Sequence, residues 1–353
     1  MSRIEKIKAI LAELKLDAFY VTHLPNIRYL SGFSGSSAYL IISKDKNYFF
    51  TDFRYKEQSK VQVKECEIIV NFSPAEEIKN VINKNGFKNI AFEPTHLTVH
   101  QLDQMKESFR GVTFTAVAER IEQLTMIKTP DEIAKILKAC DITDKVFSKL
   151  LEIIKPGMKE NDVSAEISYW HKKYGAEKDS FDPIVASGWR GALPHGMASD
   201  KVIESGEMVT LDFGCIYDGF CSDMTRTISI GKPDDEMKKI YDVVLESQVR
   251  AVNAAKEGIN TKELDNISRD YINQNGYEGK FGHGLGHGLG IEVHEMPSIS
   301  QRMDINVPAG VVFTIEPGIY VEGLGGVRIE DDILTKAGGC DVFNKSRKEL
   351  III

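Results

Sequence analysis

The sequence has no apolar run long enough to span a membrane, and it has no surplus of positive charge. It carries 44 lysine and arginine residues against 52 aspartate and glutamate residues, which gives a formal net charge of −8. An acidic chain is not attracted electrostatically to the phosphates of nucleic acid or to an anionic bilayer. We therefore expect neither nucleic acid nor a membrane among its partners.

Cysteine is scarce as well. The five cysteines are scattered without a C-x-x-C pair, which is typical of reduced, mostly structural thiols. The first residues have the apolar spacing of an amphipathic helix and contain neither the apolar core nor the small-residue cleavage site of a signal peptide. These features predict a cytoplasmic protein.

Two familiar motifs are missing from the glycine-rich stretch between Gly282 and Glu295. The stretch contains His283, His287 and His294, and no phase of it satisfies G-x-G-x-x-G. His287 and His294 are seven residues apart, so H-E-x-x-H is absent. Glycine at every second position up to Gly290 indicates that the backbone approaches a ligand or another strand closely. Histidine is the commonest metal ligand and a frequent acid or base. The alternative is a flexible glycine loop whose histidines are incidental.

The rest of the chain is long enough for two domains, with 353 residues of which 42% are hydrophobic. Strands predicted over 17–22, 38–43 and 47–51, with helices beginning near Pro74 and His96, indicate an N-terminal α/β domain. Its polar residues, including His23 and His96, are isolated in the sequence. We expect structural or surface roles for them.

A long helix is predicted to begin after this domain. Thr129 is a suitable N-cap, Pro130 suits the first helical position, and Glu132 suits the first turn. The helix is predicted to end near Ile154, and a second one to begin at Asn161. The domain boundary lies just before the first of these helices, so the predicted domains are 1–122 and 123–353.

A β-hairpin is predicted over 208–230, because Asp218-Gly219 between two apolar runs is a strong turn signal. A turn centred on Asp218-Gly219 places Asp223 diagonal to Asp212, and a turn one residue earlier places them directly opposite. Both registers put the two carboxylates on one face, within about 4.5 to 8 Å. Like charges in such positions repel, and a bound divalent cation would remove the cost. The alternative is a solvated hairpin with surface acids.

The C-terminal region repeats the arrangement. Strands over 311–316 and 326–330 fold about Gly323, so that Glu316 and Glu330 are equidistant from the turn. Arg328 shares a face with Glu330 because side chains alternate along a strand. Four carboxylates and an imidazole form an oxygen-rich donor set that suits Mn²⁺, Co²⁺ or Fe²⁺ better than a structural zinc. There are enough donors for two ions.

The same residues lie within a series of short motifs. In chain order these are Ala186-Ser-Gly188, Leu193-Pro-His-Gly196, Leu211-Asp-Phe-Gly214, Ser222-Asp-Met-Thr-Arg-Thr227, His283-Gly-Leu-Gly-His287, Val293-His-Glu295, Ile315-Glu-Pro-Gly-Ile-Tyr320 and Gly326-Val-Arg-Ile-Glu-Asp331. From Thr129 to the C-terminus the chain resembles the pita-bread metallopeptidases, and within that family most closely Xaa-Pro dipeptidase (prolidase). The preceding domain resembles the N-terminal domain of prolidase, aminopeptidase P and creatinase.

The resemblance implies an α/β (α+β) protein in which a creatinase-like domain precedes a pita-bread catalytic domain. It implies two divalent metal ions per subunit, with Mn²⁺ favoured and Co²⁺, Fe²⁺ or Zn²⁺ as alternatives. The implied ligands are Asp212, Asp223, His287, Glu316 and Glu330. In the family Asp223 and Glu330 bridge the ions. All five are present, which argues against the metal-free creatinase branch.

The resemblance also implies a mechanism, in which a hydroxide held between the two ions attacks the Xaa-Pro peptide bond. Glu316 would relay a proton to the leaving proline nitrogen, and His294 would donate to the oxyanion. His195, His283 and Arg328 would line the pocket, and Arg302 matches by spacing an arginine that some prolidases use for the C-terminus of the substrate.

A dipeptide substrate is expected, and the Met296-Pro-Ser-Ile-Ser-Gln301 segment is similar to that of prolidases. The alternatives are an aminopeptidase P that acts on longer peptides and a pita-bread binding protein that has lost catalysis. Relatives of the last kind tend to lack ligands and to carry basic tails, and this chain has neither feature. Family members are commonly dimers, so a homodimer is expected.

Overall fold

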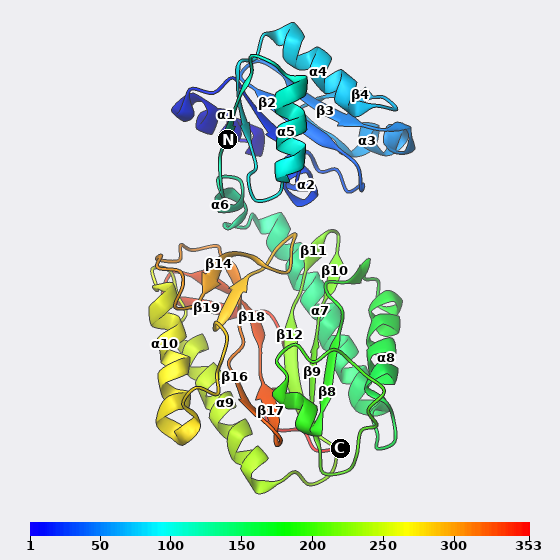
Figure 1. The fold of residues 1–353 in the computed structure, drawn as a ribbon. Helices are drawn as coiled ribbons and strands as arrows, with labels where there is room; N and C mark the ends of the chain where they lie inside the picture. The colour runs from blue at the N-terminus through cyan, green and yellow to red at the C-terminus, as the bar shows by residue number, and fades with distance from the viewer. The chain divides into compact units, whose positions relative to one another are not determined.

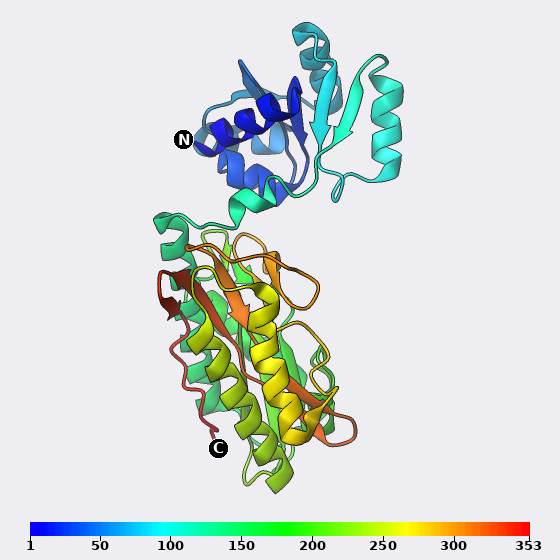
Figure 2. The same ribbon diagram turned by 90° about the vertical axis from the view of Figure 1, so that its left-hand side faces the viewer.

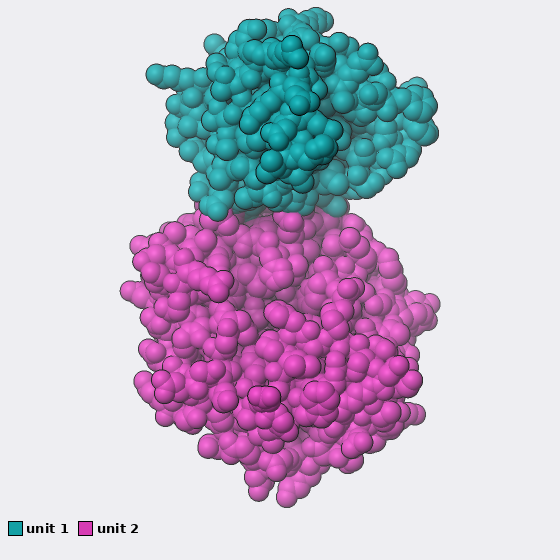
Figure 3. All heavy atoms as spheres, in the orientation of Figure 1, with its two compact units in different colours: residues 1–125 teal, residues 126–353 magenta.

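The computed structural model describes all 353 residues, which form two compact units, Met1–Thr125 and Met126–Ile353 (Figure 3). None of the helices combines the length and the apolar character that crossing a bilayer requires.

The first unit is built on a six-stranded mixed sheet with the strand order β4-β3-β2-β1-β5-β6 (Figure 1). Its strands are β1 (Ala18–Val21), β2 (Tyr39–Ser43), β3 (Asn47–Thr51), β4 (Glu67–Val70), β5 (Asn89–Phe92) and β6 (Thr113–Ala116). Its helices are α1 (Arg3–Leu14), α2 (Leu24–Ser31), α3 (Lys56–Gln62), α4 (Pro74–Asn85), α5 (Val99–Ser108) and α6 (Glu122–Thr125). The predicted α/β character is confirmed.

Local sequence explains where these helices lie. Helix α1 buries Ile4, Ile7 and Ile10 on one face, as its apolar spacing predicts. The helix predicted near His96 begins later, at Val99, because Thr98 caps it in a reciprocal capping box with Gln101.

The second unit contains two halves, each made of a helix pair packed against strands (Figures 1 and 2). In the first half α7 (Pro130–Ile153) and α8 (Glu160–Lys173) pack against β7 (Lys178–Asp179), β8 (Ile184–Ser187) and β10 (Cys215–Tyr217). The half is completed by β9 (Met208–Phe213), β11 (Phe220–Cys221) and β12 (Met224–Ser229). Thr129 and Glu132 form the capping box that starts α7, so the predicted helix start is confirmed.

In the second half α9 (Asp235–Ala254) and α10 (Thr261–Ile272) pack against each other and against strands of the C-terminal region. A five-stranded sheet has the order β14-β13-β15-β18-β19, and β16 and β17 form a separate pair. The bounds are β13 (Gly286–Gly288), β14 (Glu295–Ile299), β15 (Val312–Ile315), β16 (Gly318–Val321), β17 (Gly325–Arg328), β18 (Asp331–Lys336) and β19 (Gly339–Val342). Each half has its own large apolar core, and this close packing holds the strands of each half in fixed positions.

Candidate metal centre

The first carboxylate pair lies on the predicted hairpin. Asp212 on β9 is opposite Thr225 on β12, and Tyr217 is opposite Phe220 at the turn. The turn is therefore Asp218-Gly219, with φ values of 44° and 75° that fit a left-handed hairpin turn. Asp223 is diagonal to Asp212, which confirms the register predicted for a turn centred on Asp218-Gly219.

The second pair lies on a hairpin folded about Gly323, as predicted, with Gly318 opposite Arg328 and Ile315 opposite Asp331. One detail of the prediction is wrong, because the hairpin is not a single pair of strands. The ladder is interrupted between Ile315 and Gly318 on one strand and between Arg328 and Asp331 on the other, and Pro317 in this gap has no amide hydrogen to donate. Glu316 and Glu330 lie at this interruption, between β15 and β16 and between β17 and β18.

The glycine-rich stretch is tightly packed. A Cβ atom at Gly286 would collide with the Thr314 carbonyl, and one at Gly288 would collide with the Met296 carbonyl. These contacts bring β13 close enough to its neighbours to place His287 beside Glu316. Close backbone approach is thus confirmed for these glycines, and the flexible-loop alternative is wrong. Gly282 is an exception, since nothing lies within 4 Å of its Cβ position.

One cavity of about 890 Å³ is lined by every residue that the sequence singled out. These residues are His195, Asp212, Asp223, His283, His287, His294, Arg302, Glu316, Arg328 and Glu330. They come from both halves of the second unit, and eight of them carry a carboxylate or an imidazole. The arrangement therefore brings the two carboxylate pairs and the histidine cluster together.

The distances among the acidic residues and His287 suit bound cations. The Nε2 atom of His287 lies 3.4 Å from Glu316 Oε1 and 3.6 Å from Asp223 Oδ2. The donor atoms of Asp223, His287 and Glu330 all lie within 4.8 Å of one another. Donors that share an ion at about 2.0 to 2.2 Å are separated by such distances.

Several carboxylate oxygens in the cavity have no hydrogen-bond partner. They are Asp212 Oδ1, Asp223 Oδ1 and Glu330 Oε1, and all three residues are at most 8% exposed. The other oxygens of two of them are held, since Arg328 Nη2 donates to Asp212 Oδ2 at 2.5 Å and Thr225 Oγ1 donates to Glu330 Oε2 at 2.6 Å. Buried, unpartnered carboxylate oxygens that share a cavity are costly without a cation. The donor set therefore fits divalent metal ions.

The electrostatics point the same way. Burial, together with the neighbouring carboxylates, raises the pKa of Asp223 and of Glu330 well above the usual range. Burial also raises the pKa of Glu316 to about 8, with Asp212 adding to the effect. Burial and the adjacent His294 lower the pKa of His287 to about 3, so its imidazole is neutral, as a metal ligand must be.

The remaining histidines differ in how firmly they are held. His283 is fixed, because Nε2 lies 2.8 Å from the Tyr320 hydroxyl and Nδ1 lies 2.8 Å from the Gly284 carbonyl. The His294 ring packs against the His287 ring at 4.3 Å. His195 and Arg302 are exposed at the cavity rim.

Sequence reasoning assigned no role to Tyr320 and Arg269. The Tyr320 hydroxyl accepts from Arg328 Nη1 at 2.9 Å and also contacts His283, so it links two pocket residues. Arg269 on α10 donates to the carbonyl of His283 at 2.6 Å and lines the cavity. Tyr320 closes one of the quoted motifs, which was a usable signal, whereas Arg269 lies in an ordinary helical pattern that gives none.

The fold and the donor set together define an α/β protein with a candidate site for divalent cations on a substrate-sized cavity. Residues 134–337 match the model of metallopeptidase family M24, and residues 3–127 match the creatinase/prolidase N-terminal domain. The chain belongs to metallopeptidase family M24, whose members use divalent metal ions. The predicted resemblance and the pita-bread fold of the second unit are confirmed.

Known relatives match over the whole chain. A Xaa-Pro dipeptidase of Pyrococcus furiosus is 41% identical, with 99% of each chain covered. The structure of a Xaa-Pro dipeptidase from Bacillus anthracis is 43% identical, with a TM-score of 0.97 and 99% of each chain covered. That of an X-Pro aminopeptidase from Thermotoga maritima is 38% identical, with a TM-score of 0.93 and 100% of each chain covered.

Proposed function

We propose that the protein hydrolyses the Xaa-Pro bond of dipeptides with two divalent metal ions, preferentially Mn²⁺. The observation that carries this proposal is the set of four carboxylates and one imidazole on a single cavity, three of whose buried oxygens have no partner. The Xaa-Pro dipeptidases among its full-length relatives supply the substrate class.

In this proposal Asp212, Asp223, His287, Glu316 and Glu330 would hold the ions. Oxygen-rich sets of this kind suit Mn²⁺, and Co²⁺, Fe²⁺ or Zn²⁺ are alternatives. When bound, the ions supply a Lewis acid and lower the pKa of water. The chain's own residues supply binding, orientation and proton transfer.

Glu316 is assigned the proton transfer. The Thr314 hydroxyl donates to its Oε1 at 3.2 Å and steadies the carboxylate at the cavity wall. From there it would take a proton from the attacking water and deliver it to the leaving proline nitrogen. His294 and His195 would donate hydrogen bonds to the substrate carbonyl as negative charge develops.

Arg328 and His283 are assigned positioning roles. Arg328 is only 4% exposed, and its guanidinium contacts Asp212, the Pro194 carbonyl and Tyr320. His283 has both ring nitrogens within hydrogen-bond distance of protein atoms. These contacts leave Arg302, which is exposed at the rim, as the arginine free to bind the substrate's C-terminal carboxylate.

The experiment that tests the function is hydrolysis of Ala-Pro and of a Xaa-Pro tripeptide by the metal-depleted protein reloaded with Mn²⁺, Co²⁺, Fe²⁺ or Zn²⁺. We expect kcat/KM to be highest for the dipeptide and with Mn²⁺. A preference for the tripeptide would favour the alternative, an aminopeptidase, which the Thermotoga maritima relative also suggests. Absence of metal-dependent cleavage of either peptide would contradict both.

Three further properties belong to this proposal. The protein is a cytoplasmic homodimer, and its domains are 1–122 and 123–353. Light scattering on the purified protein tests the subunit count, and fractionation of the native cells tests the location. Limited proteolysis tests the boundary, with cleavage expected near residue 123.

A further inference from the structure

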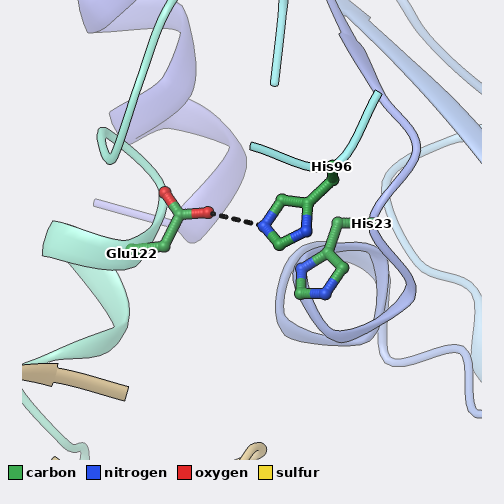
Figure 4. Close-up of side chains that lie close together, drawn as sticks. All are labelled: His23, His96 and Glu122. Atoms are coloured by element: carbon green, nitrogen blue, oxygen red, sulfur yellow. Dashed lines mark ion pairs between the residues drawn. The ribbon is translucent and has the colours of Figure 1, made fainter. Parts of the chain in front are cut away.

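Three side chains that are far apart in the sequence meet in the first unit. His23 immediately precedes α2, His96 follows β5, and Glu122 begins α6 (Figure 4). Their donor atoms all lie within 4.8 Å of one another. The two histidines are isolated in the sequence but adjacent in space.

A network of hydrogen bonds holds this group in place. Glu93 at the end of β5 is only 3% exposed and accepts from the backbone amides of Thr22 at 2.6 Å and His23 at 3.0 Å. Asn26 Nδ2 donates both to Glu93 at 2.8 Å and to Glu122 Oε1 at 2.9 Å. One buried carboxylate thus fixes the backbone of His23 and, through Asn26, the side chain of Glu122. Metal-ligating side chains typically have hydrogen-bond partners of this kind, which orient them toward the ion.

The separations between the donor atoms suit a metal ion. His96 Nε2 lies 3.7 Å from Glu122 Oε1, too far for a hydrogen bond. Two donors that are each about 2.0 to 2.2 Å from a tetrahedral zinc ion lie roughly 3.4 Å apart. The His23 and His96 rings are stacked, with centroids 3.4 Å apart, so one ring must turn out of the stack before the lone pairs of both can reach the same ion. Burial, and then the neighbouring His96, lower the pKa of His23 to about 4, so its ring is neutral.

A large cavity adjoins the two histidines. It has a volume of about 1140 Å³ and is lined by His23 and His96 together with residues such as Tyr39, Gln101 and Met105. It lies within the first unit and shares no residue with the cavity of the candidate metal centre. Three protein ligands leave a coordination position for water or a small ligand, as in catalytic zinc sites.

We propose that His23, His96 and Glu122 bind one further divalent transition-metal ion, of the Zn²⁺ class, with a coordination position open to the adjoining cavity. Two imidazoles and one carboxylate are a zinc-type donor set, in contrast to the oxygen-rich set of the other centre. The ion is additional to the two assigned to the second unit.

The test is the number of Zn²⁺ ions per chain after equilibrium dialysis of the full-length protein, measured by elemental analysis. Wild type and His100→Ala, an exposed histidine on α5, should bind the same number. His96→Ala should bind one ion fewer. Glu122→Gln keeps the oxygen that accepts from Asn26. It should lower the affinity for that ion by about a hundredfold or more, because losing a ligand costs at least as much affinity as losing a residue that hydrogen-bonds to a ligand.

The comparison separates this proposal from the proposed function, because the difference between His96→Ala and His100→Ala does not depend on how many ions the other centre holds. As a cross-check, Glu330→Ala should lose ions from the second unit and keep the one that depends on His96. Equal zinc content in His96→Ala, Glu122→Gln and His100→Ala would overturn the proposal and leave the pair as stacked rings only.

Discussion

Asp223 and Glu330 are each buried with one unpartnered oxygen, and burial together with neighbouring carboxylates raises the pKa of both well above the usual range, so a cation is needed to stabilise their charged forms. We expect Asp223→Ala or Glu330→Ala to lose bound metal and nearly all peptidase activity. The fold should survive, because each change also removes like-charge repulsion from the cavity. Elemental analysis, kcat and circular dichroism measure the three effects. Two retained ions and near-normal turnover in Asp223→Ala would rule out the assigned ligands.

His294 lines the cavity without an assigned metal contact, so its role can be separated from metal binding. We expect His294→Ala to lower kcat about a hundredfold or more while metal content stays unchanged, as when one oxyanion donor is lost. His100→Ala is the matched control, because this histidine is exposed on α5. His171 would be a poor control, since it is fully buried and 2.6 Å from Asp179. Equal losses at 294 and 100 would contradict the role.

Substitution of Arg302 tests which residue recognises the C-terminal carboxylate of the substrate. A guanidinium can pair in two places with a free carboxylate but not with a continuing amide. We expect Arg302→Ala to raise KM for Ala-Pro by about tenfold or more, as for loss of a charged hydrogen bond, with a smaller change in kcat. The preference for Ala-Pro over a Xaa-Pro tripeptide should weaken. An unchanged ratio of kcat/KM values would remove Arg302 from the substrate site.

At the scale of the element, β13 places His287 only because its glycines allow neighbouring backbone to approach. We expect Gly286→Ala to destabilise the protein by roughly 1 to 3 kcal/mol, the usual cost of overpacking, because the new Cβ would collide with the rigid Thr314 carbonyl. Gly282→Ala is the control, since its Cβ position is open. Denaturant unfolding of the two variants measures the difference, and equal midpoints would contradict the close-packing argument.

The same elements show what local sequence determines. The Asp-Gly turn defines the register that puts Asp212 and Asp223 on one face, and the Thr129–Glu132 capping box defines the start of α7. Both depend on neighbouring residues only, so they could be predicted. The break in the C-terminal hairpin was missed, because it depends on which sheet each strand joins.

At the scale of the whole molecule, the first unit shows why part of the chemistry escaped prediction. His23, His96 and Glu122 occupy no motif, and the three segments that carry them follow β1, β5 and β6, which are neighbours in the sheet. The carboxylates of the second unit were found because each pair is local to one hairpin. The centre in the second unit could therefore be predicted from sequence. The group in the first unit depends on long-range contacts and could be found only in the folded structure.

The stability of the whole molecule should depend on pH in opposite directions with and without metal. In the metal-free protein the folded-state pKa of Glu316 is raised to about 8, so the folded state binds more protons than the unfolded state as pH rises toward 8. The free energy of unfolding then falls with rising pH. Burial also raises the pKa of Asp332 to about 8, so this carboxyl group lowers the free energy of unfolding over the same pH range.

Two histidines of the cavity restrict the pH range over which the acids determine the change in stability. Burial lowers the pKa of His283 to about 4 and of His287 to about 3, so in the folded state they stay neutral while the unfolded state takes up protons below about 6.5. Their contribution rises with pH up to about 6.5 and opposes that of the acids. The acids therefore dominate the change in the free energy of unfolding only between about pH 6.5 and 8.

We therefore expect the Tm of the chelator-treated protein to fall between pH 6.5 and 8. With excess Mn²⁺ it should rise over the same range, because binding to the folded state improves as the ligands lose their protons. Glu316→Gln should flatten the fall in the metal-free protein, since the amide does not titrate. Thermal unfolding of both proteins at the two pH values, with chelator and with Mn²⁺, measures these slopes. A metal-free Tm that rises with pH in wild type would contradict the raised pKa values of the cavity acids, and with them the electrostatic argument for a bound cation.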